Sequence, residues 1–106
     1  MKFTTAAAAF LFALPALAAN CNPEGSAGSV ETYQQVAAGV CNGSCGSSSN
    51  PCRINNIYGW YVGNEKVHCW DAFNNIIAQC VQSGRGGGSW DWDSDGIDAH
   101  FYLQTR

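Results

Sequence analysis

The fold of this chain is decided by one stretch, Cys69-Trp70-Asp71-Ala72-Phe73-Asn74-Asn75-Ile76-Ile77-Ala78-Gln79-Cys80. Its apolar residues recur every three or four positions, which is the spacing of one face of an α-helix. The pattern predicts a helix over residues 65–82 with both cysteines on its core-facing side. Eleven helical residues separate Cys69 and Cys80 by about 16 Å along the axis, whereas a disulfide needs Cα atoms within about 7 Å. The two cysteines therefore cannot pair with each other, and each must fasten the helix to a different part of the chain.

A second helix is predicted earlier in the chain. Ser29 can cap a helix over residues 30–41, in which Tyr33 and Ala37 fall on a shared apolar stripe. Asn64 is expected to cap the longer helix over residues 65–82.

Strand signals flank the two helices. Residues 57–62 are rich in β-branched and aromatic side chains, which is typical of a strand. Residues 89–94 and 97–103 lie on either side of Asp95-Gly96, a hairpin turn signal. We therefore expect an α+β fold: a small antiparallel sheet, stapled by disulfides, with two helices packed on one face.

The first 19 residues have the organisation of a secretory signal peptide. A short positive start is followed by an apolar run over residues 6–14 and by small residues over 15–19. The apolar run is too short to span a bilayer, and no later stretch is long enough to do so. We expect export, with residues 1–19 removed and residues 20–106 forming one secreted, cysteine-rich domain.

The cysteines support an extracellular location. Their number is even, and all of them follow the signal segment, which fits three disulfides in an oxidising compartment. A core this small supplies only about 3–5 kcal/mol, and each bridge adds roughly 2–4 kcal/mol. Beyond the exclusion of one pair, the connectivity is open among Cys21, Cys41, Cys45, Cys52, Cys69 and Cys80.

The charge balance argues against polyanionic partners. Residues 20–106 hold four basic and eight acidic side chains, a net charge of −4. Nucleic acids and anionic membranes attract proteins through basic faces, so we expect neither as a partner. The basic residues are also dispersed along the sequence, which predicts no local basic patch: Arg53, Lys66, Arg85 and Arg106.

Large aromatic rings are numerous for so short a chain. A two-layer fold buries only one face of its sheet, so some rings stay exposed, although burial in the core explains any single ring better. Exposed Trp or Tyr beside Asp is typical of a surface that binds a carbohydrate or a protein. The candidate contact residues are Tyr58, Trp60, Trp90, Asp91, Trp92 and Asp93.

A metal site and a catalytic site are both considered. The run Asp91-Trp92-Asp93-Ser94-Asp95-Gly96 matches the start of a calcium loop, but Tyr102 stands where that loop needs Glu. A solvated hairpin face explains the acidic residues better, so we expect no metal and no cofactor. Small secreted ribonucleases use one Glu, one Arg and one or two His around a phosphate. Those residue types are present at Glu65, His68, Arg85 and His100.

The chain is nevertheless expected to be non-catalytic. Glu65 and His68 fall near a predicted helix start and Arg85 falls in a glycine-rich loop, so convergence on one phosphate is not expected. The sequence holds no Ser nucleophile elbow, no HExxH and no CxxC. Asn42-Gly43-Ser44 is an N-glycosylation acceptor sequence, and both a used and an unused site fit its place between two cysteines.

Residues 57–103 combine a Cys-x10-Cys helix, a glycine-rich loop and a closing hairpin, carried by the runs 59–64, 69–80, 86–90 and 101–103. This combination resembles small secreted cysteine-rich proteins of filamentous fungi, which include virulence effectors, killer-toxin-like proteins and a mushroom glycan-binding family. The resemblance implies a non-catalytic secreted protein that acts on a host or a competitor. Our leading hypothesis is an effector-like monomer that binds a host or competitor protein or glycan. The alternatives are a killer-toxin-like antimicrobial protein and a small secreted ribonuclease.

Overall fold

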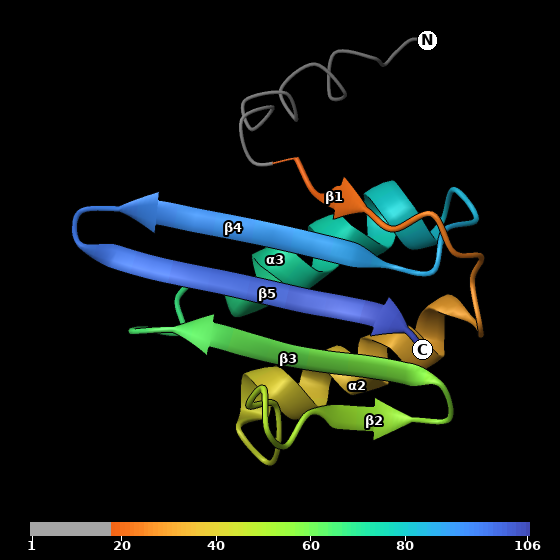
Figure 1. Ribbon diagram of the computed structural model, residues 1–106, viewed down its shortest axis with the longest axis horizontal. Helices are drawn as coiled ribbons and strands as arrows, with labels where there is room; N and C mark the ends of the chain where they lie inside the picture. The colour runs from red at the N-terminus through yellow and green to blue at the C-terminus, as the bar shows by residue number, and fades with distance from the viewer. Residues whose placement is uncertain (1–17) are drawn as a thin grey trace, which may run out of the picture.

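The computed structural model describes residues 18–106, so nearly all of the predicted signal segment lies outside the described residues. Five antiparallel strands form one sheet in the order β1-β4-β5-β3-β2, and two helices lie on one of its faces (Figure 1). The expected α+β fold is confirmed. Along the chain the elements are β1 (Asn20–Cys21), α2 (Val30–Asn42), β2 (Cys52–Ile54), β3 (Ile57–Gly63), α3 (Cys69–Ile76), the π-helical turn η2 (Ile77–Val81), β4 (Gly88–Ser94) and β5 (Ile97–Thr105).

Helix α2 begins where the sequence predicts. The Ser29 hydroxyl accepts a hydrogen bond from the Thr32 backbone N–H at 3.2 Å, which satisfies one of the free amides of the first helical turn. Gly43 ends the helix with a left-handed φ of 83°, a conformation that glycine adopts without strain. The helix turns its apolar stripe toward the sheet and buries Tyr33, Val36, Ala37 and Val40.

Helix α3 begins later than predicted, at Cys69 instead of residue 65. His68, directly before it, has a left-handed φ of 60°, which interrupts the helical path. The prediction that Asn64 caps this helix is therefore wrong. The Asn64 side chain instead binds the β4–β5 hairpin. It donates to the Gly96 carbonyl and accepts from the Asp98 backbone N–H, both at 3.0 Å. The helical path then continues as η2, so both cysteines of the deciding stretch still lie on it.

Strands β4 and β5 form the predicted hairpin. Asp95 and Gly96 both have positive φ, 55° and 80°, as the two-residue turn that matches strand twist requires. Strand β5 also pairs with β3 in antiparallel register, with Trp60 opposite Tyr102. The short strands β1 and β2 were not predicted, because two or three residues are too few for a periodic signal. They extend the two edges of the sheet.

The core lies between the helices and the inner face of the sheet. Alternate residues of β5 point inward and are buried, namely Ala99, Phe101 and Leu103. On β3, Gly59 leaves space for the first helix, since a Cβ there would lie 2.8 Å from Cγ1 of Val36.

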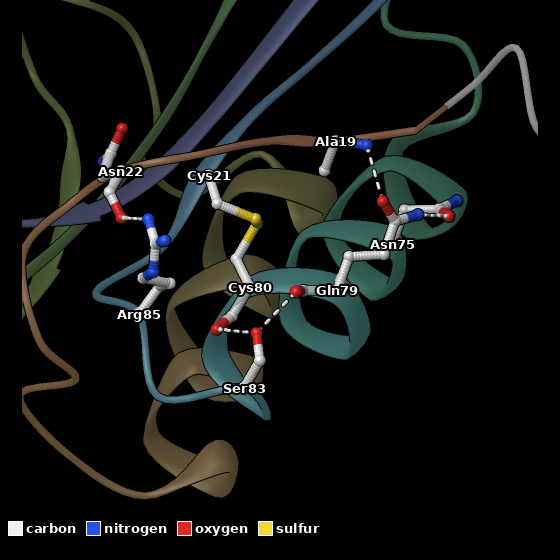
Figure 2. Close-up of a disulfide and its surroundings, with 8 residues drawn as sticks. All are labelled: Ala19, Cys21, Asn22, Asn75, Gln79, Cys80, Ser83 and Arg85. Atoms are coloured by element: carbon white, nitrogen blue, oxygen red, sulfur yellow. Dashed lines mark hydrogen bonds between the residues drawn. A yellow bond between two sulfur atoms is a disulfide. The ribbon is translucent and has the colours of Figure 1, made fainter.

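Three disulfides staple this core, and no cysteine within residues 18–106 is free. One joins the two helices, one joins β1 to η2 (Figure 2), and one closes the loop before β2. The prediction that Cys69 and Cys80 each fasten their helix to a different part of the chain is confirmed. The pairs are Cys41–Cys69, Cys21–Cys80 and Cys45–Cys52.

Candidate functional site

One face of the sheet is covered by neither a helix nor a loop of residues 18–106, and we call it the open face (Figure 1). Side chains alternate along a strand, so the neighbours of buried residues point to this face. The strand registers align these side chains in rows that cross the sheet, such as Ser89–Tyr102–Trp60 and Asp91–His100–Val62.

One end of the open face is built from stacked arginine and aromatic side chains. Trp60 stacks on Tyr102 of the neighbouring strand, with ring centroids 5.0 Å apart and planes inclined by 15°. The guanidinium carbon of Arg106 lies 4.9 Å from the Trp60 centroid and 4.7 Å from the Tyr58 centroid. On the β2 side, Arg53 lies 5.2 Å from the same Tyr58 ring. We call these five residues the arginine–aromatic ladder.

The ladder concentrates positive charge. Within residues 18–106 every ion pair involves a histidine, so neither arginine of the ladder is neutralised by a carboxylate. Arg53 uses only its Nε, which donates to the Asn55 carbonyl at 2.7 Å. The expectation that basic residues stay dispersed is therefore wrong for Arg53 and Arg106. Arg53 reaches Tyr58 because β2 pairs with β3, and Arg106 reaches the same ring because it directly follows β5.

The opposite end of the open face, next to the hairpin turn, is acidic. His100 lies between two carboxylates, with Nδ1 2.6 Å from Asp91 Oδ1 and Nε2 2.7 Å from Asp98 Oδ1. The hydrogen bond to Asp91, helped by Asp98, raises the pKa of His100 above its ordinary value of 6.5, against the opposing effect of burial. Asp93 faces Asp98 across the hairpin. We call Asp91, Asp93 and Asp98 the acidic cluster.

The predicted contact residues are divided between the two faces of the sheet. Trp90 is only 1% exposed and belongs to the core, so its prediction as a contact residue is wrong. Trp92 points to the same helix side, where it is half-buried beside the His68 ring at 4.5 Å. The other four lie on the open face: Tyr58, Trp60, Asp91 and Asp93.

Three residues of the arginine–aromatic ladder were not recognised as contact candidates. Tyr102 could have been predicted as a contact residue, because strand alternation places it on the same face as Asp98 and His100. Arg53 and Arg106 carry no such signal, since one lies on an unpredicted strand and the other follows the last strand.

The four residues of the ribonuclease hypothesis do not converge. His100 lies on the open face, whereas His68 packs against Trp92 on the helix side. Arg85 lies before β4, at the end of that strand remote from the hairpin turn, and donates to the Asn22 carbonyl at 3.1 Å (Figure 2). Glu65 lies in the connection between β3 and α3. Acid–base catalysis needs these groups within hydrogen-bond reach of one phosphate, so the geometry gives this hypothesis no support.

Residues 18–106 contain neither a metal-binding cluster nor a helix that could span a membrane. Here no group of three or more His, Cys, Asp or Glu side chains is arranged to hold a metal ion. The calcium-loop pattern is split, with Asp91 bound to His100 and Asp95 in the hairpin turn. No helix in this part of the chain combines the length and apolar character needed to cross a membrane.

The N-glycosylation acceptor sequence lies at the end of a helix. Asn42 is the last residue of α2 and is exposed, and the chain turns away from the helix at Gly43. The position is accessible to a modifying enzyme, and its use stays a prediction.

Comparisons with protein-family models, with curated proteins and with solved structures found no match to this chain.

Proposed function

We propose that this chain is a secreted, non-catalytic, effector-like protein that binds a carboxylate-bearing glycan of a host or competitor through the arginine–aromatic ladder. The observation that carries the proposal is the pair of guanidinium groups on the Tyr58 ring, neither of which has a carboxylate partner within residues 18–106. Guanidinium groups bind carboxylates with paired, charge-assisted hydrogen bonds.

The stacking of the ladder determines what it can offer a ligand. Trp60 and Tyr102 each turn one ring face toward the other, so a ligand cannot reach these two faces but can still reach the ring edges. An indole N–H and a phenol hydroxyl lie at those edges, and neither has a hydrogen-bond partner in the described part of the chain. Together with the guanidinium N–H groups they form a row rich in donors, which complements a ligand rich in acceptors.

The composition of the open face favours a glycan over a protein. Stable protein interfaces bury about 800 Å² on each partner around an apolar core. Within residues 18–106 only two large hydrophobic side chains are strongly exposed, Val62 on the open face and Trp70 on α3. A row of guanidinium, indole and phenol groups with few exposed aliphatic side chains around it fits the hydroxyls and carboxylates of a sugar chain better.

The acidic cluster gives the proposed site a direction. Its carboxylates repel an anion at the hairpin end of the open face, whereas the ladder attracts one at the other end. We therefore place the acidic sugar over Tyr58 and Trp60, near the β2 edge of the sheet.

Binding to immobilised uronate-containing oligosaccharides tests the proposal, with neutral chitin and β-glucan oligosaccharides on the same array. Loss of a hydrogen bond to a charged group costs about 1.5–3 kcal/mol, so Arg53→Gln and Arg106→Gln should each weaken binding by at least about tenfold. Arg85→Gln is the matched control, because it removes the same charge outside the ladder and should bind like the parent. Equal binding by all three variants, or a preference for neutral sugars, would refute the assignment.

The place of action is tested separately. Infiltration of purified protein into plant tissue and growth-inhibition assays on fungi and bacteria distinguish a host target from a competitor. In either setting the ladder variants should lose the response while Arg85→Gln keeps it. A response that survives in both ladder variants would show that the open face is not the contact surface.

A further inference from the structure

We propose that the signal segment is removed between Ala18 and Ala19, so that the mature protein begins at Ala19 and its new α-ammonium group is held by Gln79. The inference rests on the secretion that the proposed function requires. It moves the boundary one residue from that suggested by composition, which placed the signal at residues 1–19.

The residues before the cut support this position. Signal peptides end in a small-residue, A-x-A-like motif. A cut after Ala18 places alanines at the last and third-last positions of the signal, Ala16 and Ala18. A cut after Ala19 would place the larger Leu17 at the third-last position, so only the first cut completes the motif.

Ala19 makes contacts that belong to the folded protein. Its methyl group is half-buried and packs against the core, whereas Ala18 is exposed. The Ala19 backbone nitrogen donates to Gln79 Oε1 at 2.9 Å (Figure 2). Directly after it, β1 pairs with β4, and Cys21 is bridged to Cys80. A cut after Ala18 preserves all of these contacts, and a cut after Ala19 removes the first two.

The Gln79 side-chain oxygen that accepts from Ala19 is held in place by other hydrogen bonds. Gln79 Nε2 donates to Asn75 Oδ1 at 2.8 Å, and Asn75 Nδ2 donates to the Asp71 carbonyl at 2.8 Å. These two hydrogen bonds direct Gln79 Oε1 toward Ala19, and Figure 2 shows the one between Gln79 and Asn75. An ammonium donor makes a stronger hydrogen bond than a peptide N–H, so cleavage strengthens this contact.

Secretion of the full chain from yeast, followed by intact mass and N-terminal peptide analysis, tests the position of the cut. We expect Ala19 as the first residue. A mature chain that begins at Asn20 would overturn this inference and leave the proposed function intact. A chain retained in the cell with residues 1–18 attached would contradict both.

The role of Gln79 has its own test in the secreted protein. Gln79→Leu should raise the unfolding equilibrium constant by about threefold to tenfold, since a typical hydrogen bond stabilises a fold by about 0.5–1.5 kcal/mol. Gln82→Leu is the matched control, because Gln82 is exposed, follows η2 and makes no side-chain hydrogen bond within residues 18–106. Equal effects of the two substitutions would show that Gln79 does not hold the new terminus.

Discussion

The guanidinium carbon of Arg106 lies 4.7 Å from the centroid of the Tyr58 ring, although the two residues are 48 positions apart in the sequence. Strand β5 ends beside the start of β3, and the Arg106 backbone N–H donates to the Asn56 carbonyl at 3.0 Å. The last residue is therefore held against the sheet, and its side chain stacks between two rings of the open face.

Removal of this stacking should destabilise the fold. Each cation–π contact at a partly exposed site contributes about 0.5–1 kcal/mol, and Arg106 makes two. We expect Arg106→Ala to lower the free energy of unfolding by about 1 kcal/mol, measured by urea denaturation of the oxidised protein. Arg106→Lys keeps the charge without the planar group and should recover only part of the loss. Full recovery by lysine would show that charge, and not stacking, matters.

Stability should depend on pH through His100. Its pKa is raised in the folded protein, so its contribution is complete below 6.5, the ordinary value, and is lost as the pH rises through the folded pKa. The free energy of unfolding should therefore fall as the pH rises above 6.5 and through the raised pKa of His100, and His100→Asn should abolish that component. Asp91→Asn should reduce it as well, since the hydrogen bond to Asp91 is its main cause.

Asp95→Asn is the control for this pH dependence. It makes the same charge change in the hairpin turn, where asparagine tolerates a positive φ. A pH slope that is equal in the Asp91 and Asp95 variants would contradict the role given to the His100 pair.

The three disulfides should differ in their contributions. Loop-closure entropy grows with the number of residues enclosed, and the sequence separations are 59 for Cys21–Cys80 and 7 for Cys45–Cys52. Replacement of the first pair by alanine should cost about 4 kcal/mol and of the second about 2 kcal/mol, as measured by guanidinium denaturation. The reverse order would show that native contacts of the individual bridges outweigh chain entropy.

The two tryptophans of β4 should behave differently. Trp90 is fully buried, so Trp90→Ala should cost about 3–5 kcal/mol and leave little folded protein at 37 °C. Trp92 is half-buried at the rim of the core, so Trp92→Ala should cost less and leave a cooperative thermal transition. Near-UV circular dichroism and thermal melts distinguish these outcomes, and similar losses would contradict the burial difference.

Long periodic segments were predictable, because many residues repeat one physical preference. The α2 stripe, the Cys69–Cys80 geometry and the Asp95-Gly96 hairpin all depend on local spacing and are confirmed. The start of α3 was not predictable, because His68 adopts a left-handed conformation that is uncommon for any residue other than glycine.

The candidate site was harder to predict than the fold. Strand alternation separates the two faces of β4 but does not show which face the helices cover. Residues of both faces were therefore named as contact candidates, and Trp90 among them proved to be buried. Arg53 and Arg106 become neighbours only through the register of β2, β3 and β5. Such long-range pairing leaves no periodic trace in the sequence.

The two short outer strands have a consequence for storage at high concentration. Exposed sheet edges are templates for edge-to-edge polymerisation into fibrils. Strand β1 occupies the first residues of β4, and the remainder of that edge displays Asp91 and Asp93, which repel an identical chain. At the other border β2 covers the start of β3, and the Tyr61 backbone N–H further along donates to the Gly46 carbonyl at 2.9 Å. A protein with both borders shielded in this way should remain dispersed even in a crowded, concentrated solution.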